Sequence, residues 1–161
     1  MSHAQPTPGH AWLHRLVGRW TSTFECRMAP DEPLMHSTGS ETVRSLGGLW
    51  TLGEGLGDAP DGQPTQSLMT LGYDPATKRF VGTFVVSVMA HLWVYDGALD
   101  AAGQRLILDT EGPSFSGAPG MVKYQDIIEF LDDNHRTLTG LDHGPDGNYR
   151  KFMTDNYRRE T

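Results

Sequence analysis

Short segments with a period of two alternate with clusters of turn-forming residues along most of this sequence. In the clearest segment, residues 19–28, one face carries Trp20, Ser22, Phe24, Cys26 and Met28. Successive side chains of a β-strand point to opposite faces, so this spacing predicts a strand with one half-buried face. About ten such segments follow one another without a βαβ rhythm, which predicts sequential antiparallel hairpins rather than a parallel sheet.

The connections between these segments carry readable turn chemistry. In residues 74–78, Pro75 sets the φ angle of a type I turn, and the Asp74 carboxylate is placed to accept a hydrogen bond from the backbone N–H of Thr77. This local bonding accounts for Asp74, which we therefore interpret as a turn residue rather than a catalytic one. Three other residues suit left-handed positions that close hairpins: Gly103, Asn134 and Gly147.

The beginning of the chain has a different period. Residues 9–17, followed by Gly18, predict a short amphipathic helix whose apolar face carries Trp12, Leu13, Leu16 and Val17. The length of 161 residues suits one domain, and 19 glycines and 10 prolines favour many short elements. We expect an all-β, up-and-down antiparallel barrel of about ten strands, because closure removes both sheet edges. A two-sheet sandwich is the alternative. Residues 1–10 are expected to be flexible, and residues 11–161 to form the domain.

Charge and cysteine content limit the partners and the compartment. The formal charge is −7, from 13 basic and 20 acidic side chains, which opposes binding to nucleic acid or to anionic membranes. Cys26 is the single cysteine, so an internal disulfide is excluded and a reducing compartment is favoured. The sequence contains neither a long apolar span nor a secretory signal, and we expect a cytoplasmic protein.

Several ordered motifs resemble one bacterial family of unknown function, the one numbered 1579. They are "LVGRW", "LGGLW", "LGYDPATKRFVGTF", "HLWVYDGALDAAG", "LDTEGPSF" and "KFMTDNYRR". The resemblance runs from about residue 10 to the C-terminus and implies a lipocalin-like, or calycin-like, barrel. It implies no established activity and supplies no catalytic residues.

Two more distant resemblances concern single positions. Gly18-Arg19-Trp20 is similar to the Gly-x-Trp of calycins, which implies a Trp at the closed end of the barrel, covered by Arg158 or Arg159. Nitrobindins bind haem in a similar barrel through a His near its C-terminal end. His143 is the nearest analogue in order, but "DHGPDG" is typical of a turn, so haem is not expected and the cofactor is left unknown.

The richest cluster of polar and aromatic residues is "HLWVY", in which His91, Trp93 and Tyr95 share one strand face. This face either contacts a ligand in the barrel or simply fills the interior with its rings. Glu54 is in phase with Trp50, so it is a candidate buried carboxylate and general base. It is also compatible with a position facing water or an arginine.

Other polar groups are weaker candidates. Asp109 and Glu111 share a face opposite two leucines, which favours an outward position, and the loop that follows to Gly120 is a candidate lid. Asp126 is either a lumen partner of Tyr124 or a cross-strand partner of a basic residue. The seven histidines are dispersed and no ligand motif is present, so no metal site is expected.

We predict that the barrel binds a small, mainly apolar molecule in its lumen, and that the chain is a binding protein rather than an enzyme. The predicted lining is Trp50, Glu54, Met69, Tyr73, Phe84, His91, Trp93, Tyr95 and Tyr124. One alternative is an enzyme that uses His91 and Glu54 as an acid–base pair. The other is a filled, non-catalytic barrel that forms a homodimer through "FVVSVM" and "LWV".

Overall fold

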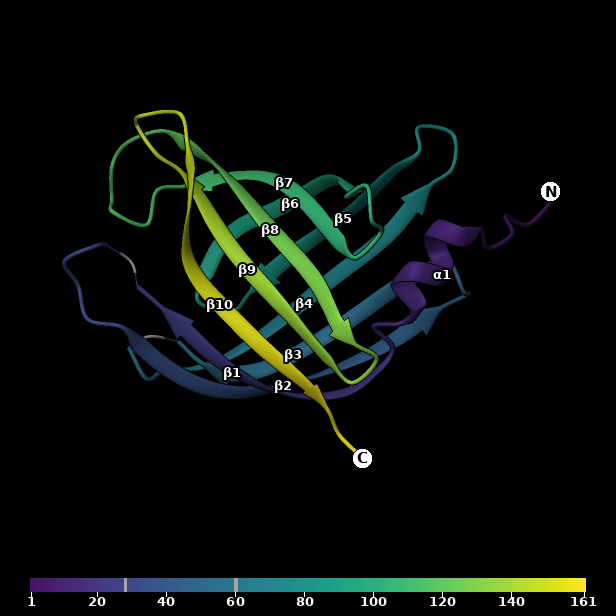
Figure 1. Ribbon diagram of the computed structural model, residues 1–161, viewed down its shortest axis with the longest axis horizontal. Helices are drawn as coiled ribbons and strands as arrows, with labels where there is room; N and C mark the ends of the chain where they lie inside the picture. The colour runs from purple at the N-terminus through teal and green to yellow at the C-terminus, as the bar shows by residue number, and fades with distance from the viewer. Residues whose placement is uncertain (28, 60) are drawn as a thin grey trace.

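The computed structural model describes residues 1–27, 29–59 and 61–161, and these form a closed antiparallel barrel of ten strands with one short helix (Figure 1). Each strand pairs with its neighbours in sequence, and the last strand pairs with the first. The predicted up-and-down barrel is therefore confirmed, and the sandwich alternative is wrong. The elements are α1 (Pro8–His14), β1 (Gly18–Cys26), β2 (Met35–Leu46), β3 (Trp50–Asp58), β4 (Pro64–Asp74), β5 (Arg79–Val86), β6 (Met89–Leu99), β7 (Arg105–Pro113), β8 (Met121–Asp132), β9 (His135–His143) and β10 (Tyr149–Arg159).

The helix is shorter than the apolar pattern predicted. The backbone N–H of Thr7 donates to Nδ1 of His10 at 2.9 Å, which caps the start of α1. After His14 the chain tightens, and the N–H of Leu16 bonds to the carbonyl of Leu13 at 3.0 Å, three residues back. Gly18 then begins β1. Met28, predicted at the end of that strand, and Pro60, in a predicted loop, lie outside the described residues.

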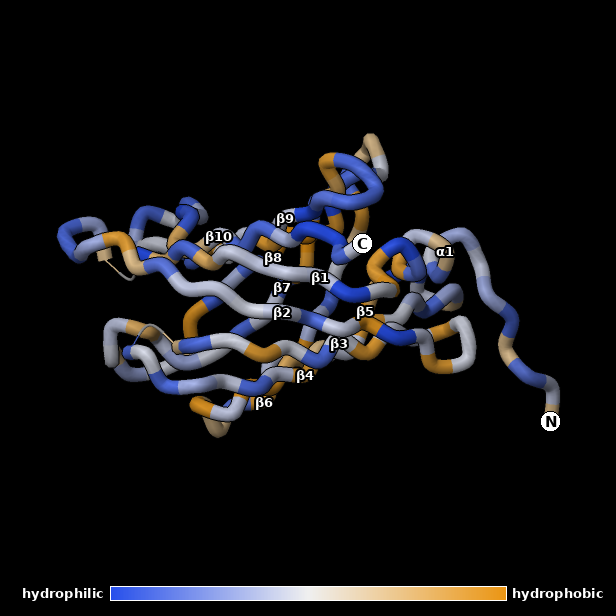
Figure 2. The backbone as a smooth tube through the Cα atoms, turned by 90° about the horizontal axis from the view of Figure 1, so that it is seen from below, coloured by the Kyte–Doolittle hydropathy of each residue, from blue (hydrophilic) through white to orange (hydrophobic). Residues whose placement is uncertain are grey.

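The helix and the apolar core close one end of the barrel (Figure 1 and Figure 2). Trp12 packs edge-on against Phe130, with 5.3 Å between ring centroids, and its Nε1 donates to the carbonyl of Gly103 at 2.8 Å. Trp20 is fully buried, and its Nε1 donates to the carbonyl of Leu16 at 2.8 Å. No helix in the described part of the chain is long and apolar enough to cross a membrane.

Arg159 covers Trp20, as the resemblance to calycins implied for Arg158 or Arg159. Its Cζ lies 4.2 Å from the centroid of the indole ring. Its Nη1 donates to the carbonyl of Val17 at 2.7 Å, and its Nη2 donates to that of Arg15 at 2.9 Å. One side chain of β10 thus binds the segment between α1 and β1 to the last strand, which fixes the closed end.

The turn at residues 74–78 also lies at the closed end, beside α1. The Asp74 carboxylate accepts a hydrogen bond, but the donor is the N–H of Ala76, at 2.9 Å, and not that of Thr77. The left-handed position is taken by Lys78, at φ 58°. Gly103 and Gly147 have the expected positive φ, whereas Asn134 does not and instead donates its N–H to the Asp132 carboxylate.

Candidate functional site

The barrel contains a cavity of about 320 Å³ that adjoins the packed core of the α1 end, since Tyr95 and Leu138 belong to both. Its mouth is formed by the connections at the other end of the barrel, including the one between β7 and β8 (Figure 1). The filled-barrel alternative is therefore wrong for this part of the interior. A volume of this size is at the lower end of the range for pockets that hold small organic molecules.

Small residues make this part of the barrel hollow. The register across β2, β3 and β4 places Gly55 between Glu41 and Ser67 on the inner face, and Gly57 beside Thr65 on the same face. A Cβ added at Gly57 would find its nearest neighbour, the Thr38 carbonyl oxygen, at 3.5 Å, which is ordinary contact. Gly57 therefore leaves space in the lumen, whereas at Gly53 and Gly55 the side chains of Glu41 and Ser67 already lie where a Cβ would be.

Apolar side chains form the wall near the mouth: Phe24, Met69, Phe84, Phe115, Phe152 and Met153. Phe115 comes from the connection between β7 and β8, and its ring lies 5.5 Å from that of Phe152 and 6.1 Å from that of Trp93. This connection, predicted as a candidate lid, places an aromatic ring over part of the lumen.

The inner end of the cavity is polar, beginning with a hydrogen-bonded pair from β6 and β8. The hydroxyl of Tyr95 donates to Oδ2 of Asp126 at 2.5 Å. Burial raises the pKa of Asp126 to about 6, although the hydrogen bond from Tyr95 acts in the opposite direction. Burial also raises the pKa of Tyr95 well above its ordinary value, so the tyrosine remains a hydrogen-bond donor at neutral pH.

A second Tyr–Asp pair lies on β10. Burial, aided by the charge of Glu41, raises the pKa of Asp155 to about 6, while hydrogen bonds from Tyr157 and Ser22 and the charge of Arg136 lower it. Oδ1 of Asp155 is buried and has no hydrogen-bond partner in the described part of the chain. Tyr157 also has a pKa raised well above its ordinary value, with burial as the largest cause.

A buried ion pair completes the polar end. Nη2 of Arg136 donates to Oε1 of Glu41, and the two side chains are 3% and 13% exposed. The guanidinium lies over the rings of Trp20 and Tyr157, at 4.6 Å and 3.9 Å from their centroids. Removing either charge would leave the other buried and unpaired, so this pair is a fixed part of the barrel.

Of the predicted lining, Met69, Phe84 and Tyr95 line the cavity. Tyr73 also faces inward, but it packs on Phe80 at the closed end, with 4.8 Å between ring centroids. Tyr124 faces inward as well and donates its hydroxyl to the carbonyl of Pro113 at 2.8 Å, so it is not the partner of Asp126.

Trp50 and Glu54 lie on the outer face, so their predicted place in the lumen was wrong. Trp50 is 42% exposed and Glu54 is exposed, while the alternate residue Gly53 is buried. The physical reason is that the small residues of β3 face the hollow interior and its large residues face outward. His91 shares the inner face with Trp93, so the structure does not bring it together with Glu54 as an acid–base pair.

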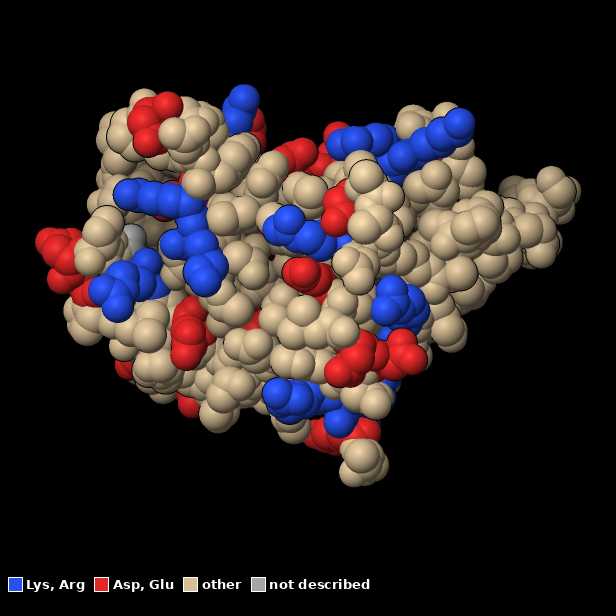
Figure 3. All heavy atoms as spheres, in the orientation of Figure 1, with Lys and Arg blue, Asp and Glu red and all other residues tan. Residues whose placement is uncertain are grey.

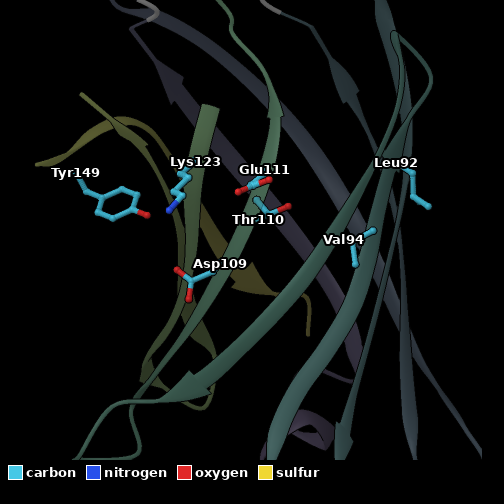
Figure 4. Close-up of a pocket in the computed structure, with 7 residues that line it drawn as sticks. All are labelled: Leu92, Val94, Asp109, Thr110, Glu111, Lys123 and Tyr149. Carbon is cyan, nitrogen blue, oxygen red and sulfur yellow. The ribbon is translucent and has the colours of Figure 1, made fainter. Parts of the chain in front are cut away.

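His91 lies where the neighbouring strands β6 and β7 are no longer paired. β6 and β7 pair only over Asp96–Leu99 and Leu106–Asp109, and beyond this a groove of about 580 Å³ runs between them. Leu92 lies on one side of the groove (Figure 4). Nε2 of His91 is 2.9 Å from the carbonyl oxygen of Glu111 and so bridges the two strands.

Within the described residues, no group of three or more His, Cys, Asp or Glu side chains is arranged to hold a metal ion.

The polar residues of the cavity were mostly missed by sequence reasoning. Arg136, Asp155 and Tyr157 lie on the hairpin of β9 and β10, whereas Glu41 lies on β2, and only closure of the barrel through β1 brings it to them. The alternate glycines of "GEGLG" were the available signal, because they mark the inner face of a hollow strand pair.

The fold and the cavity define a lipocalin-like antiparallel barrel with a partly hollow interior. The chain belongs to the family described as "Protein of unknown function (DUF1579)", which matches residues 5–159. A search of the curated proteins finds no match.

Two solved structures have a similar fold. Rv2717c from M. tuberculosis is 11% identical, with a TM-score of 0.66 over 98% of this chain and 100% of that one. EF1p2_mFAP2b bound to DFHBI is 14% identical, with a TM-score of 0.51 over 94% of this chain and 99% of that one. At these identities the similarity shows the fold alone.

Proposed function

We propose that this protein binds a small, mainly apolar organic molecule inside the barrel, with one polar end of that molecule directed at the Tyr–Asp pairs. The observation that carries the proposal is the cavity of about 320 Å³ with aromatic and thioether walls and a polar inner end. Such a combination gives affinity through apolar burial and orientation through a few fixed polar groups. One solved protein of this fold, EF1p2_mFAP2b, is bound to DFHBI.

The charge of the protein supports a small-molecule partner over a polyanion. The formal charge is −7, and on the face shown in Figure 3 acidic and basic side chains are interspersed. A nucleic acid needs a concentrated basic surface. The lone cysteine is consistent with the proposed cytoplasmic location.

The test uses Nile red, an uncharged apolar dye whose fluorescence rises in an apolar site. We expect saturable binding to the wild type and a loss of at least about tenfold in affinity for Gly57→Leu, whose new side chain enters the cavity. Glu54→Gln changes an outward position on the same strand and is the matched control. Equal binding by Gly57→Leu with a native circular dichroism spectrum, or no binding by the wild type, would overturn the proposal.

A homodimer remains a second proposal, and one observation favours it. The outer face of β5 and β6 carries exposed Val85, Leu92 and Val94, with exposed fractions of 40%, 54% and 58%. Adjacent exposed apolar side chains are typical of an interaction surface. Sedimentation velocity over a range of concentrations tests this, and a monomer at the highest concentration would count against it.

A further inference from the structure

We infer that the lumen takes an amphipathic amine: an apolar chain or ring that ends in a protonated nitrogen, which pairs with the lumen carboxylates Asp126 and Asp155. This inference rests on the proposed function, because it names the chemical class of the ligand that the lumen would bind. It follows from which hydrogen-bonding groups are already used in the empty barrel and which remain.

The charges that line the cavity are unbalanced. Among its described lining residues, the carboxylates are Glu41, Asp58, Asp126 and Asp155, whereas Arg136 is the one basic side chain. That guanidinium is already ion-paired with Glu41. A ligand with a carboxylate end would therefore meet acidic side chains without a free cation to pair with, and this repulsion disfavours fatty-acid-like molecules.

The two tyrosine hydroxyls of the polar end already interact with carboxylates. Tyr95 donates to Asp126, and Tyr157 bonds to Asp155. Two buried groups of the lining have no partner among the described residues: Oδ1 of Asp155, an acceptor, and Nε of Arg136, a donor whose guanidinium is already paired with Glu41. A ligand group that pairs with the Asp155 oxygen must donate a hydrogen bond, and a positive charge strengthens that bond.

The positions of the two carboxylates suit one such group. Asp126 on β8 and Asp155 on β10 are separated by the single strand β9, where their partners across the sheet are Gly140 and Leu138. Their tyrosines approach each other, since the charge of Tyr157 acts on Tyr95. An ammonium group has three donors, so it can donate to a lumen carboxylate and to a neighbouring acceptor at the same time.

The remainder of the cavity suits the rest of the molecule. Phe24, Met69 and Phe84 lie on the way from the mouth to the polar end. Aromatic faces and a thioether accept an aliphatic or aromatic stem without a fixed shape.

The test compares n-octylamine, 1-octanol and octanoate as competitors of Nile red at about pH 7.5. These probes share one apolar chain and differ only in the polar end. We expect the amine to displace the dye at concentrations at least about tenfold lower than the alcohol or the carboxylate, since only the amine donates charge-assisted hydrogen bonds to the lumen aspartates. Tighter binding of octanoate, or equal binding of amine and alcohol, would overturn the inference. If Nile red itself does not bind, the proposed function fails instead.

Two variants locate the effect. Asp155→Asn and Asp126→Asn keep the shape of the side chain and remove its charge. Each should lower the affinity for n-octylamine by about tenfold and leave the affinity for 1-octanol unchanged. Asp31→Asn, at an exposed site in the connection between β1 and β2, is the control and should change neither. If both lumen variants bind the amine as the wild type does, the nitrogen is not held by these carboxylates.

Acidification gives an independent readout. Both aspartates have a pKa of about 6, so they become protonated between about pH 7.5 and about pH 5. Over this range the affinity for n-octylamine should fall, while the affinity for 1-octanol stays the same. The charged and titratable groups that face the two aspartates are Tyr95, Tyr157, Glu41 and Arg136. Amine affinity that does not change over this range would contradict the inference.

Discussion

The Asp126→Asn variant should make the protein more stable at alkaline pH and not at acid pH. Burial raises the pKa of Asp126 from 3.8 to about 6 in the folded protein. The folded state therefore holds the proton more tightly than the unfolded state. The stability that this carboxyl contributes is fully present below pH 3.8 and is lost as the pH rises through about 6. At about 1.4 kcal/mol per pH unit, the loss above that range is about 3 kcal/mol.

An asparagine at this position carries no charge at any pH, and its amide oxygen still accepts the hydrogen bond from Tyr95. The variant should therefore exceed the wild type in free energy of unfolding by up to about 3 kcal/mol at about pH 8. At about pH 4 the advantage should disappear or reverse by about 1 kcal/mol, because the amide brings an N–H without a partner.

The measurement is urea unfolding followed by circular dichroism at several pH values, with linear extrapolation to water. The quantity compared is the difference between variant and wild type, which cancels the pH dependence of all other groups. Asp31→Asn is the control and should give a flat difference, since its side chain is exposed. If the difference in free energy of unfolding between Asp126→Asn and the wild type also does not change with pH, the reasoning is refuted. It would mean that Asp126 has the same pKa in the folded and the unfolded state.

Three further variants test the closed end, the wall and the turn. Arg159→Lys should lower the free energy of unfolding by about 2 kcal/mol, because lysine cannot cover Trp20 and reach both carbonyls at once, as urea unfolding would show. Gly112→Ala should cost about 1–3 kcal/mol and shift the tryptophan emission, because a Cβ there would lie 2.1 Å from the ring of buried Trp93. Asp74→Ala should cost about 1 kcal/mol and leave Nile red binding unchanged, because its carboxylate bonds only within the turn.

Each of these predictions has a matched comparison. For Gly112→Ala it is Gly72→Ala, whose Cβ would meet the ring of Trp50 at 2.4 Å; that ring is 42% exposed and can move, so the cost should be smaller. Equal losses in the free energy of unfolding for the two variants would mean that burial of the neighbouring tryptophan does not determine the cost. Asp74→Asn, which keeps an acceptor, should retain most of the stability lost in Asp74→Ala. For Arg159→Lys, an unchanged urea midpoint would show that the guanidinium contacts do not hold the closed end.

The side-chain period and the turn residues were sufficient to predict an antiparallel meander, and the barrel was preferred to a two-sheet sandwich because closure removes both sheet edges. Alternation in "RWTSTFEC" shows which residues share a face, and turn formers at regular intervals indicate that consecutive strands pair. The polar groups of the lumen could not be predicted in the same way. Asp126 and Tyr95 lie 31 residues apart, and Arg136 and Glu41 lie 95 apart, so only closure of the sheet brings them into contact.

The sequence by itself determined an antiparallel meander, because period and turn chemistry act locally along the chain. The place of Trp20 at the closed end was implied by the resemblance to calycins and not by the local pattern. Only the tertiary structure decided which face of each strand is inside. Alternation is symmetric between the two faces, and the usual rule that large apolar residues are buried fails where the interior is hollow. In β3 the glycines lie on the inner face, and Trp50 and Glu54 lie on the outer face. That reversal places Gly55 and Gly57 in the lining of the cavity.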